Sequence, residues 1–290
     1  MNLVNTDLSD DPEYILFEEY VDGNTCAKAT AKSYRTTFRK LRNLLGKPIH
    51  ETSQETLINV ISAGVENINT QQALLNIAVI VRKCVYSLDV DKLTDQRALN
   101  KTTVSESLKM KNRYIILPTV HEFDDYIECL WKDCRYREFI INFLIRHYYV
   151  RNKDLMFDIV ERRQDTDDKM NYIWLDRRHR RCVYIRNDYK TACTYGSKTT
   201  EITDERFFEA IKRCLKCVND VESRFFPITL DASKIGYYVQ KMSFKNLGEG
   251  NLLKILINHH KDDYAKIQEI SRSRGTDTNT LLQSYNISYK

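Results

Sequence analysis

The chain has 290 residues, 42% of them hydrophobic, which is enough to build one large domain or two ordinary ones, and we expect two. Only eight glycines and four prolines occur, so collagen-like and long low-complexity segments are excluded and a helix-rich protein with few tight turns is favoured. The formal net charge of +5 permits binding to nucleic acid without requiring it.

The apolar runs, such as Ala73–Val81, are too short to cross a bilayer, and residues 1–14 are acidic where a secretion signal would be basic. We therefore expect a soluble intracellular protein, in the cytoplasm or nucleus, or in a host cell or virion if the chain is viral. The eight cysteines are then expected to be reduced thiols.

Cys214 and Cys217 have the spacing of half a zinc site. The surrounding sequence has helical periodicity, no glycine of a zinc knuckle is present, and no second pair has matching spacing. Two thiols one turn apart on a helix is the better interpretation, so we expect no metal and no other cofactor.

The first part of the chain predicts a bundle of helices, because apolar residues recur at helical spacing in four segments: 10–22, 25–46, 52–64 and 69–88. The last of these is apolar nearly all round and is the expected central helix. The second has a basic face, on which Arg35, Arg39 and Arg42 are candidate DNA-binding residues. We assign residues 1–92 to an amino-terminal domain.

Between the two domains the periodicity fades into polar and charged sequence, and we predict a linker over residues 93–117. Its end carries a basic cluster in which Lys111 and Arg113 are further candidate DNA contacts. Basic clusters are often only solvated surface, and that alternative stays open for each of them.

The rest of the chain, residues 118–290, predicts a mainly α domain with a small antiparallel sheet. Two helices come first, 119–134 and 136–160, and the second is interrupted by a polar cluster that begins at Arg151. The period then changes to two, which indicates three strands: 170–176, 181–188 and 198–203. Helical patterns then resume over residues 205–221, 233–242, 250–258, 264–272 and 279–285.

Two segments of this second domain are distinctive. In "YYVRNKDLMF" a buried helix closes on Arg151, with Asp154 and Leu155 behind it. In "SRGTDTNTLLQSY" a turn with Gly275 and Thr276 precedes Tyr285 near the end of the chain. A basic cluster with Arg272 and Arg274 leads into this second segment.

These segments, and the order of helical bundle, linker, helices, small sheet and helices, resemble the tyrosine recombinases, the phage-integrase family. The resemblance covers nearly the whole chain and implies a core-binding bundle of the SAM-like type followed by a catalytic domain. It also implies Tyr285 as nucleophile, Arg151 as a catalytic arginine, and Thr276 at the place of a histidine or tryptophan. Divergent members of this kind occur in viruses with large DNA genomes.

In that family a lysine in the turn after the second strand acts as general acid. Lys190 is the candidate here, and Lys198 is a less well-placed one. The family's His-x-x-Arg motif is missing, because Gly250 and Leu253 stand at those positions. Lys254 follows and is a candidate substitute for the charge of the second arginine, whereas His259 and His260 lie too far along the helix to be assigned.

The resemblance implies double-stranded DNA as partner, self-association on the DNA, and cleavage through a phosphotyrosyl bond without a metal. A phenol has a pKa of about 10, so its attack near neutral pH requires cationic neighbours or a base. The extra charge of the transition state is matched by a guanidinium fork, which Arg151 would supply.

Other functions remain open. The chain is alternatively a noncatalytic DNA-binding protein of the same fold, acting in viral genome packaging, virion structure or transcription. It is also comparable with a type IB topoisomerase, or with a helical protein-interaction module that has no salt-dependent affinity for DNA. Each site residue has a structural alternative too: Tyr285 as a packing residue, Arg151 as a helix cap, and Lys190 as an exposed turn residue.

Overall fold

The computed structural model describes residues 8–24, 28–113, 115–162, 169–217, 225–226 and 234–285, with backbone only at 28, 109, 113, 216 and 217. Contacts divide the chain into two compact units, Met1–Leu108 and Lys109–Lys290. In the part that the structure describes, no helix is long and apolar enough to span a membrane.

The first unit is a helical bundle, as the sequence predicts. Its elements are α1 (Pro12–Asn24), α2 (Lys28–Leu45), α3 (Gln54–Gly64), α4 (Ile68–Val79), the π-helical turn η1 (Ile80–Val85) and α5 (Asp91–Arg113), whose end continues into the second unit. The expected central helix is α4, where Leu74, Ile77 and Ala78 are fully buried. Phe17 of α1 stacks on Phe38 of α2 in the same core.

The segment that we predict as a linker, 93–117, is largely helical, because α5 runs for 23 residues. Most of its side chains are exposed or half-buried, and Leu93 is one of the few in the core. A polar helix without a broad apolar stripe has no periodicity for the sequence to reveal. The weak apolar periodicity of residues 93–117 therefore reflects a solvent-exposed helix.

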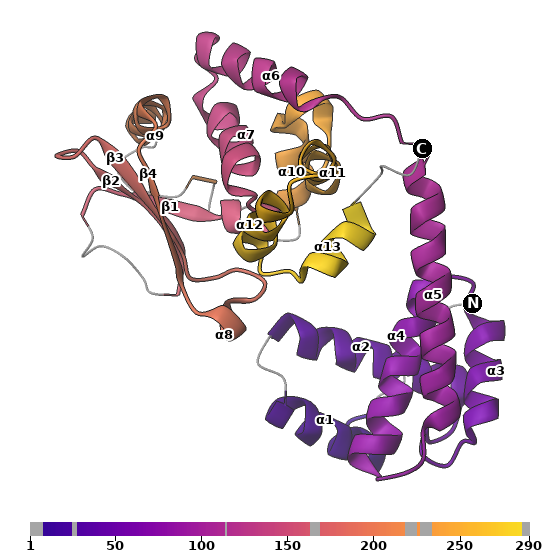
Figure 1. The fold of residues 1–290 in the computed structure, drawn as a ribbon. Helices are drawn as coiled ribbons and strands as arrows, with labels where there is room; N and C mark the ends of the chain where they lie inside the picture. Colours follow the sequence, from indigo (N-terminus) through magenta and orange to yellow (C-terminus); the bar gives the residue numbers. More distant parts are fainter. Residues whose placement is uncertain are drawn as a thin grey trace. The chain divides into compact units, whose positions relative to one another are not determined.

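Helices of the second unit surround one buried element. The first are α6 (Val120–Lys132), which begins with a capping box between Thr119 and Glu122, and α7 (Tyr136–Tyr148). Phe139, Ile140 and Leu144 of α7 are fully buried, because α7 packs against α6, α9 and α11. Figure 1 shows α7 between the sheet and the helices α10 and α11.

The sheet differs in one respect from the prediction. The strands are β1 (Phe157–Val160), β2 (Asn171–Asp176), β3 (Arg181–Arg186) and β4 (Lys198–Ile202), in that order across a four-stranded sheet. The last three are the predicted antiparallel strands, but β1 is added parallel to β2, so the sheet is mixed and the expectation of a purely antiparallel sheet is wrong. We expected residues 157–160 at the end of a helix.

The remaining elements follow the predicted order. They are the 3₁₀ turn η2 (Asn152–Leu155), α8 (Ala192–Tyr195), α9 (Glu205–Cys217), α10 (Ile235–Met242), η4 (Phe244–Asn246), α11 (Glu249–His259), α12 (Tyr264–Arg274) and α13 (Thr278–Tyr285). The register between β3 and β4 pairs Arg186 with Lys198 at one end of the sheet. This sheet end therefore carries two cations side by side, next to the carboxyl end of α12 that they both contact.

Candidate functional site

Arg151 stands where a buried helix stops. Helix α7 ends at Tyr149, which adopts left-handed backbone angles (φ 56°), and Arg151 then precedes the turn η2 in an extended conformation. The Arg151 amide donates to the carboxylate of Asp154 at 3.1 Å, which fixes the turn. The helix therefore stops before Arg151, and Asp154 is a local partner of the Arg151 backbone.

The side chain of Arg151 reaches the segment that carries the candidate tyrosine. Its Nη2 donates to the hydroxyl Oγ1 of Thr276 at 2.6 Å, across 125 positions of sequence. Arg151 and Thr276, predicted separately, are therefore in direct contact. Burial lowers the pKa of the half-buried Arg151 guanidinium, and the neighbouring charge of Arg274 lowers it further.

Thr276 is placed by a turn that requires glycine. Gly275 ends α12 with φ +56°, and a Cβ there would lie 2.1 Å from Oγ1 of Thr191 in the loop between β3 and β4. A side chain at this position would be strained by its backbone and would push the loop away. The glycine of the predicted motif thus lets α12, the loop and Thr276 approach one another.

Tyr285 is the last residue of α13 and is half-buried. Its ring packs against the core, with Cε1 3.9 Å from the position that a Cβ on Gly250 would take, and its carbonyl accepts a hydrogen bond from Asn258. The Tyr285 phenolate is among the charges that act on the pKa of Arg151, raising it. Phenol and guanidinium therefore lie within electrostatic reach of each other.

Arg274 is a second arginine at this site. It is 4% exposed, donates to the carbonyls of Tyr149 and Val150, and forms an ion pair with Glu249. The other oxygen of Glu249 accepts from the amide of Asn152 at 2.7 Å. We expected Arg274 to contact DNA; the structure places it in the interior, where it ties α11 and α12 to the turn that presents Arg151.

A third arginine, Arg186, was not identified from the sequence. It lies at the end of β3, is 3% exposed, and donates from Nη1 to Asp154 and to the carbonyl of Ser273, both at 3.4 Å. Strand alternation puts Arg186 on the same side as the buried Cys182 and Tyr184. A charged residue in line with a buried strand face was the signal that could have revealed it.

The two candidate lysines have different surroundings. Lys190 is exposed in the loop after β3. Lys198, at the start of β4, donates from Nζ to the carbonyls of Arg272 at 2.6 Å and Ser273 at 3.2 Å. Burial lowers the pKa of Lys198, and the charges of Arg186 and Arg151 add to this effect. The structure thus brings the less favoured candidate, Lys198, into the field of Arg151.

Lys254, the candidate substitute for a missing arginine, is half-buried in α11, and burial lowers its pKa. Among the described residues, the basic side chains that contact the Arg151 turn directly are Arg186 and Arg274. The position of the missing arginine itself is occupied by Leu253, which is 1% exposed in the core. Leu253 therefore packs in the core and supplies no charge there.

The predicted DNA-binding arginines of α2 have partners within the first unit. Arg35 pairs with Glu18, Arg39 donates to the Tyr14 hydroxyl, and Arg42 pairs with Asp11. These contacts join α2 to α1 and its amino-terminal end. Of the remaining candidates, Lys111 and Arg272 are exposed, and the side chain of Arg113 lies outside the described residues.

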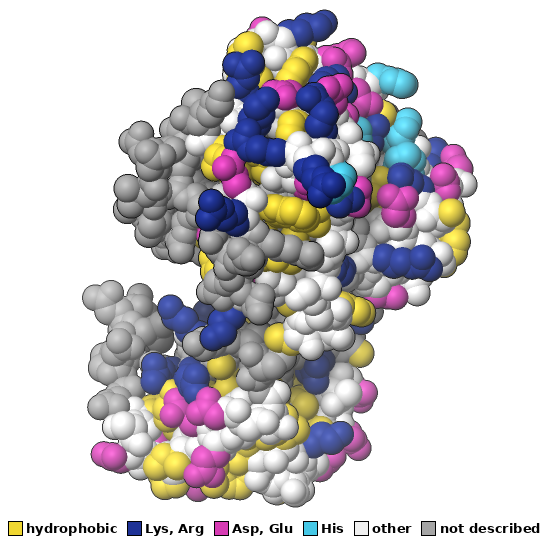
Figure 2. All heavy atoms as spheres, turned by 90° about the vertical axis from the view of Figure 1, so that its left-hand side faces the viewer, with side chains coloured by type: hydrophobic (Ala, Val, Ile, Leu, Met, Phe, Trp, Pro, Cys, Tyr) yellow, Lys and Arg dark blue, Asp and Glu magenta, His cyan; other side chains and the backbone are white. Residues whose placement is uncertain are grey.

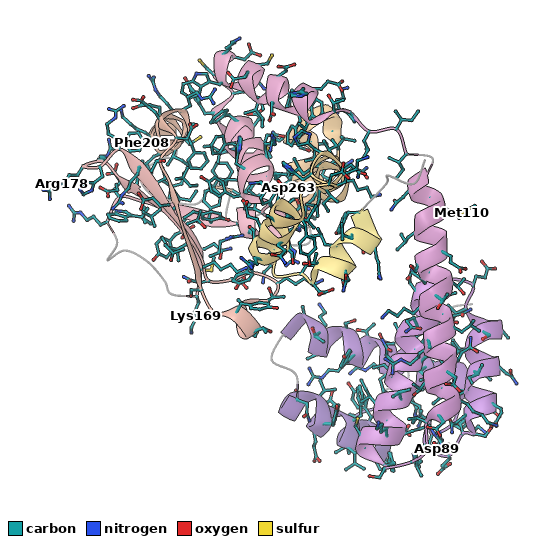
Figure 3. The ribbon with its side chains drawn as sticks, viewed as in Figure 1. Asp89, Met110, Lys169, Arg178, Phe208 and Asp263 are labelled. Atoms are coloured by element: carbon teal, nitrogen blue, oxygen red, sulfur yellow. The ribbon has the colours of Figure 1, made fainter. Side chains whose placement is uncertain are left out.

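Other basic residues of the second unit lie on the β2–β3 hairpin. Figure 3 shows Arg178 at its tip, pointing away from the sheet. Its neighbour Arg180 pairs with Glu205, and Arg181 pairs with Asp176 and Glu201. Figure 2, which views this side of the unit, shows Lys and Arg side chains interleaved with carboxylates, so charge here is mixed. Among the described residues, no group of His, Cys, Asp or Glu is arranged to hold a metal ion.

Comparisons with known proteins give a loose likeness. No family model and no curated protein matches the sequence. Among solved structures, the crystal structure of XerA recombinase is similar with a TM-score of 0.40 and 15% sequence identity, covering 94% of this chain and 92% of that one. At this level the geometry of Arg151, Thr276 and Tyr285 carries the functional argument by itself.

Proposed function

We propose that the protein binds duplex DNA and breaks and rejoins it through a phosphotyrosyl bond at Tyr285. The observation that carries this proposal is the hydrogen bond from Arg151 to Thr276, which joins the end of α7 to the segment that presents Tyr285. The proposal joins the phenol of Tyr285 and the guanidinium of Arg151 with three further cations from other parts of the second unit, Arg186, Lys198 and Arg274.

The reaction needs a nucleophile and a group that stabilises extra negative charge. The Tyr285 oxygen attacks the phosphorus, its proton leaves to solvent or a base, and the bond from phosphorus to the 5′ oxygen breaks. Arg151 donates to the nonbridging oxygens, whose charge grows in the transition state. One such donor is typically worth about 100- to 1000-fold in rate.

The leaving 5′ oxygen must take up a proton. Lys198 is the better candidate donor, because burial and the nearby charges of Arg186 and Arg151 lower its pKa and so make it a stronger acid. Lys190 is the alternative, since its loop packs on Gly275 through Thr191 and is exposed for contact with DNA. Substituting each lysine by glutamine separates the two roles.

Charge balance favours an anionic ligand at the site. Arg151, Arg186, Lys198 and Arg274 contribute four positive charges, whereas Asp154 and Glu249 contribute two negative ones. Both carboxylates act on the protein itself, because each accepts a backbone amide of the Arg151 turn. The excess positive charge is left for a phosphate.

A second function is favoured by the missing groups. Gly250 and Leu253 supply neither a histidine nor an arginine, and Arg274 is occupied by Glu249 and two carbonyls. A protein with this site would also serve as a noncatalytic DNA-binding protein, for example in viral genome packaging, virion structure or transcription.

The two functions are separated by trapping a covalent adduct. Nicked suicide duplexes of random sequence are incubated with the protein, and protein–DNA adducts are resolved on denaturing gels. We expect an adduct with the wild type and none with Tyr285→Phe. Tyr264→Phe is the matched control, because Tyr264 is 64% exposed on α12 and has no role in the proposal. Binding of the duplexes without any adduct would establish the noncatalytic function instead.

A further inference from the structure

A pocket of about 510 Å³ opens beside the candidate site, between the end of α7, strand β4 and helix α12. Arg186, Lys198 and Arg272 line it, together with the hydroxyl-bearing Thr199 and Thr200. Neither Arg151, Thr276 nor Tyr285 is among its lining residues. The pocket therefore shares Arg186 and Lys198 with the candidate site, and Arg272 lines it as well.

Arg186 lacks partners for a buried guanidinium. Its Nε is buried and has no hydrogen-bond partner among the described residues, although the side chain is 3% exposed. Its two hydrogen bonds both leave from Nη1 and are long, at 3.4 Å. Asp154, its one carboxylate partner, also serves the amide of Arg151. A buried cation so weakly paired is costly unless an anion completes it.

The rest of the lining also suits an anion. Glu269 is the one carboxylate among the lining residues, and it is paired with Lys266 at 2.7 Å. His147 is kept towards its neutral form, because burial lowers its pKa. Arg272 lines the pocket and its side chain is exposed, so it can contact a ligand without any local unfolding of the protein. Arginine, lysine and hydroxyl donors that line the same pocket are the groups that commonly bind phosphate.

We propose that this pocket binds a phosphate group through Arg186, Lys198 and Arg272. The pocket is larger than a single phosphate group, so it also has room for a phosphate that is part of a larger molecule. The chemistry fits two sources, a phosphate of the DNA backbone next to the one that is cleaved, or a free phosphorylated molecule. With a DNA phosphate the proposal rests on the proposed function, whereas with a free one it stands alone.

The test measures binding of inorganic phosphate and pyrophosphate to the DNA-free full chain by calorimetry at constant ionic strength. We expect saturable binding at one site and a loss of affinity of about tenfold or more in Arg186→Gln and in Arg272→Gln. Lys132→Gln, on the exposed end of α6, is the matched control and should bind as the wild type does. Because Arg186→Gln removes a buried charge, its fold is checked by thermal unfolding, while exposed Arg272 tests the pocket without that risk.

A short duplex then distinguishes the sources. Competition between duplex and phosphate assigns the pocket to the DNA backbone, and simultaneous binding assigns it to a free phosphorylated molecule; either result supports the phosphate site. Absence of saturable phosphate binding, or binding that is the same in the two arginine variants, overturns the proposal. None of these binding measurements depends on DNA cleavage. A negative result for phosphate binding is therefore distinct from a negative result in the adduct experiment with Tyr285→Phe.

Discussion

At the scale of single residues, Arg151 donates to Thr276, and in the proposed function it also binds the phosphate that is cleaved. We expect Arg151→Ala to lower adduct formation about 100- to 1000-fold while DNA affinity changes little. Thr276→Val removes the partner but keeps the guanidinium, so it should lower adduct formation less. Adduct yields and affinities of the three proteins check this. Normal cleavage with a lowered melting temperature in Arg151→Ala would show a structural role alone.

The buried Arg274 forms an ion pair with the half-buried Glu249, and we expect this pair to stabilise the fold. Removing one partner leaves the other charge uncompensated, so we expect Arg274→Met to lower the free energy of unfolding by about 3 to 5 kcal/mol. Glu249→Met should cost a similar amount, and the double variant less than the sum. Denaturant unfolding measures all three. Additive losses would contradict the pairing that the structure shows.

We expect His147 to make the stability of the second unit depend on pH. Burial, followed by the charge of Arg146, lowers its pKa below the ordinary value of about 6.5, so the folded protein resists protonation there. Asp124 and Asp204 oppose this shift and Arg206 adds to it. The unfolded chain binds the proton more readily, and stability is therefore lost as pH falls below about 6.5 towards the folded pKa.

Unfolding experiments between pH 7.5 and 5.5 test this effect at His147. We expect the wild type to lose stability over this range and His147→Asn to lose less of it. His260, whose pKa burial also lowers, remains in both proteins and contributes equally to each. Equal pH dependence of the two proteins would show that His147 does not carry the effect.

At the scale of elements, the turn after α12 sets the distance between the loop and the site. Gly275→Ala meets both a left-handed φ of +56° and the Thr191 hydroxyl, so we expect a loss of at least about 1 to 2 kcal/mol of stability. Adding Thr191→Ala should restore the part due to the clash. Gly248→Ala is the control, since a Cβ there meets nothing within 4 Å. Thermal unfolding gives the comparison, and equal effects at Gly248 and Gly275 would refute it.

Strong periodicity made most elements predictable. The helices α1 to α4, the strands β2 to β4 and the helices α11 to α13 all lie close to their predicted ranges. Strand β1 was missed, because its short apolar run directly follows a buried helix and the period cannot distinguish the two. Helix α5 was missed because its exposed polar surface leaves no apolar stripe.

The sequence did not reveal those residues near the candidate site whose contacts arise only when distant segments pack together. Arg151, Thr276 and Tyr285 became candidates because each lies in a local sequence motif, and their roles remain predictions. Arg186 was not a candidate, since its burial follows from the register of β3 with β4, and Lys198 was ranked second because its proximity to Arg151 depends on the packing of α12. The spacing of residues along the sequence reveals neither the register of β3 with β4 nor the packing of α12.

At the scale of the whole molecule, the chain forms two units, and we propose that cations of the second unit surround a phosphate of the DNA. The expected domains, 1–92 and 118–290, remain predictions, as does the assignment of DNA contacts to the first unit. The central claim is narrower: the phenol of Tyr285 forms the bond to DNA.

The most direct measurement is mass spectrometry of the trapped adduct. Trypsin cleaves after Arg274 and after Lys290, and no lysine or arginine lies between them, so residues 275–290 form one peptide. Fragmentation of the nucleotide-bearing peptide then separates Tyr285 from Tyr289. We expect the added mass of the nucleotide on Tyr285. A nucleotide on Tyr289, or on a tyrosine outside this peptide, would contradict it.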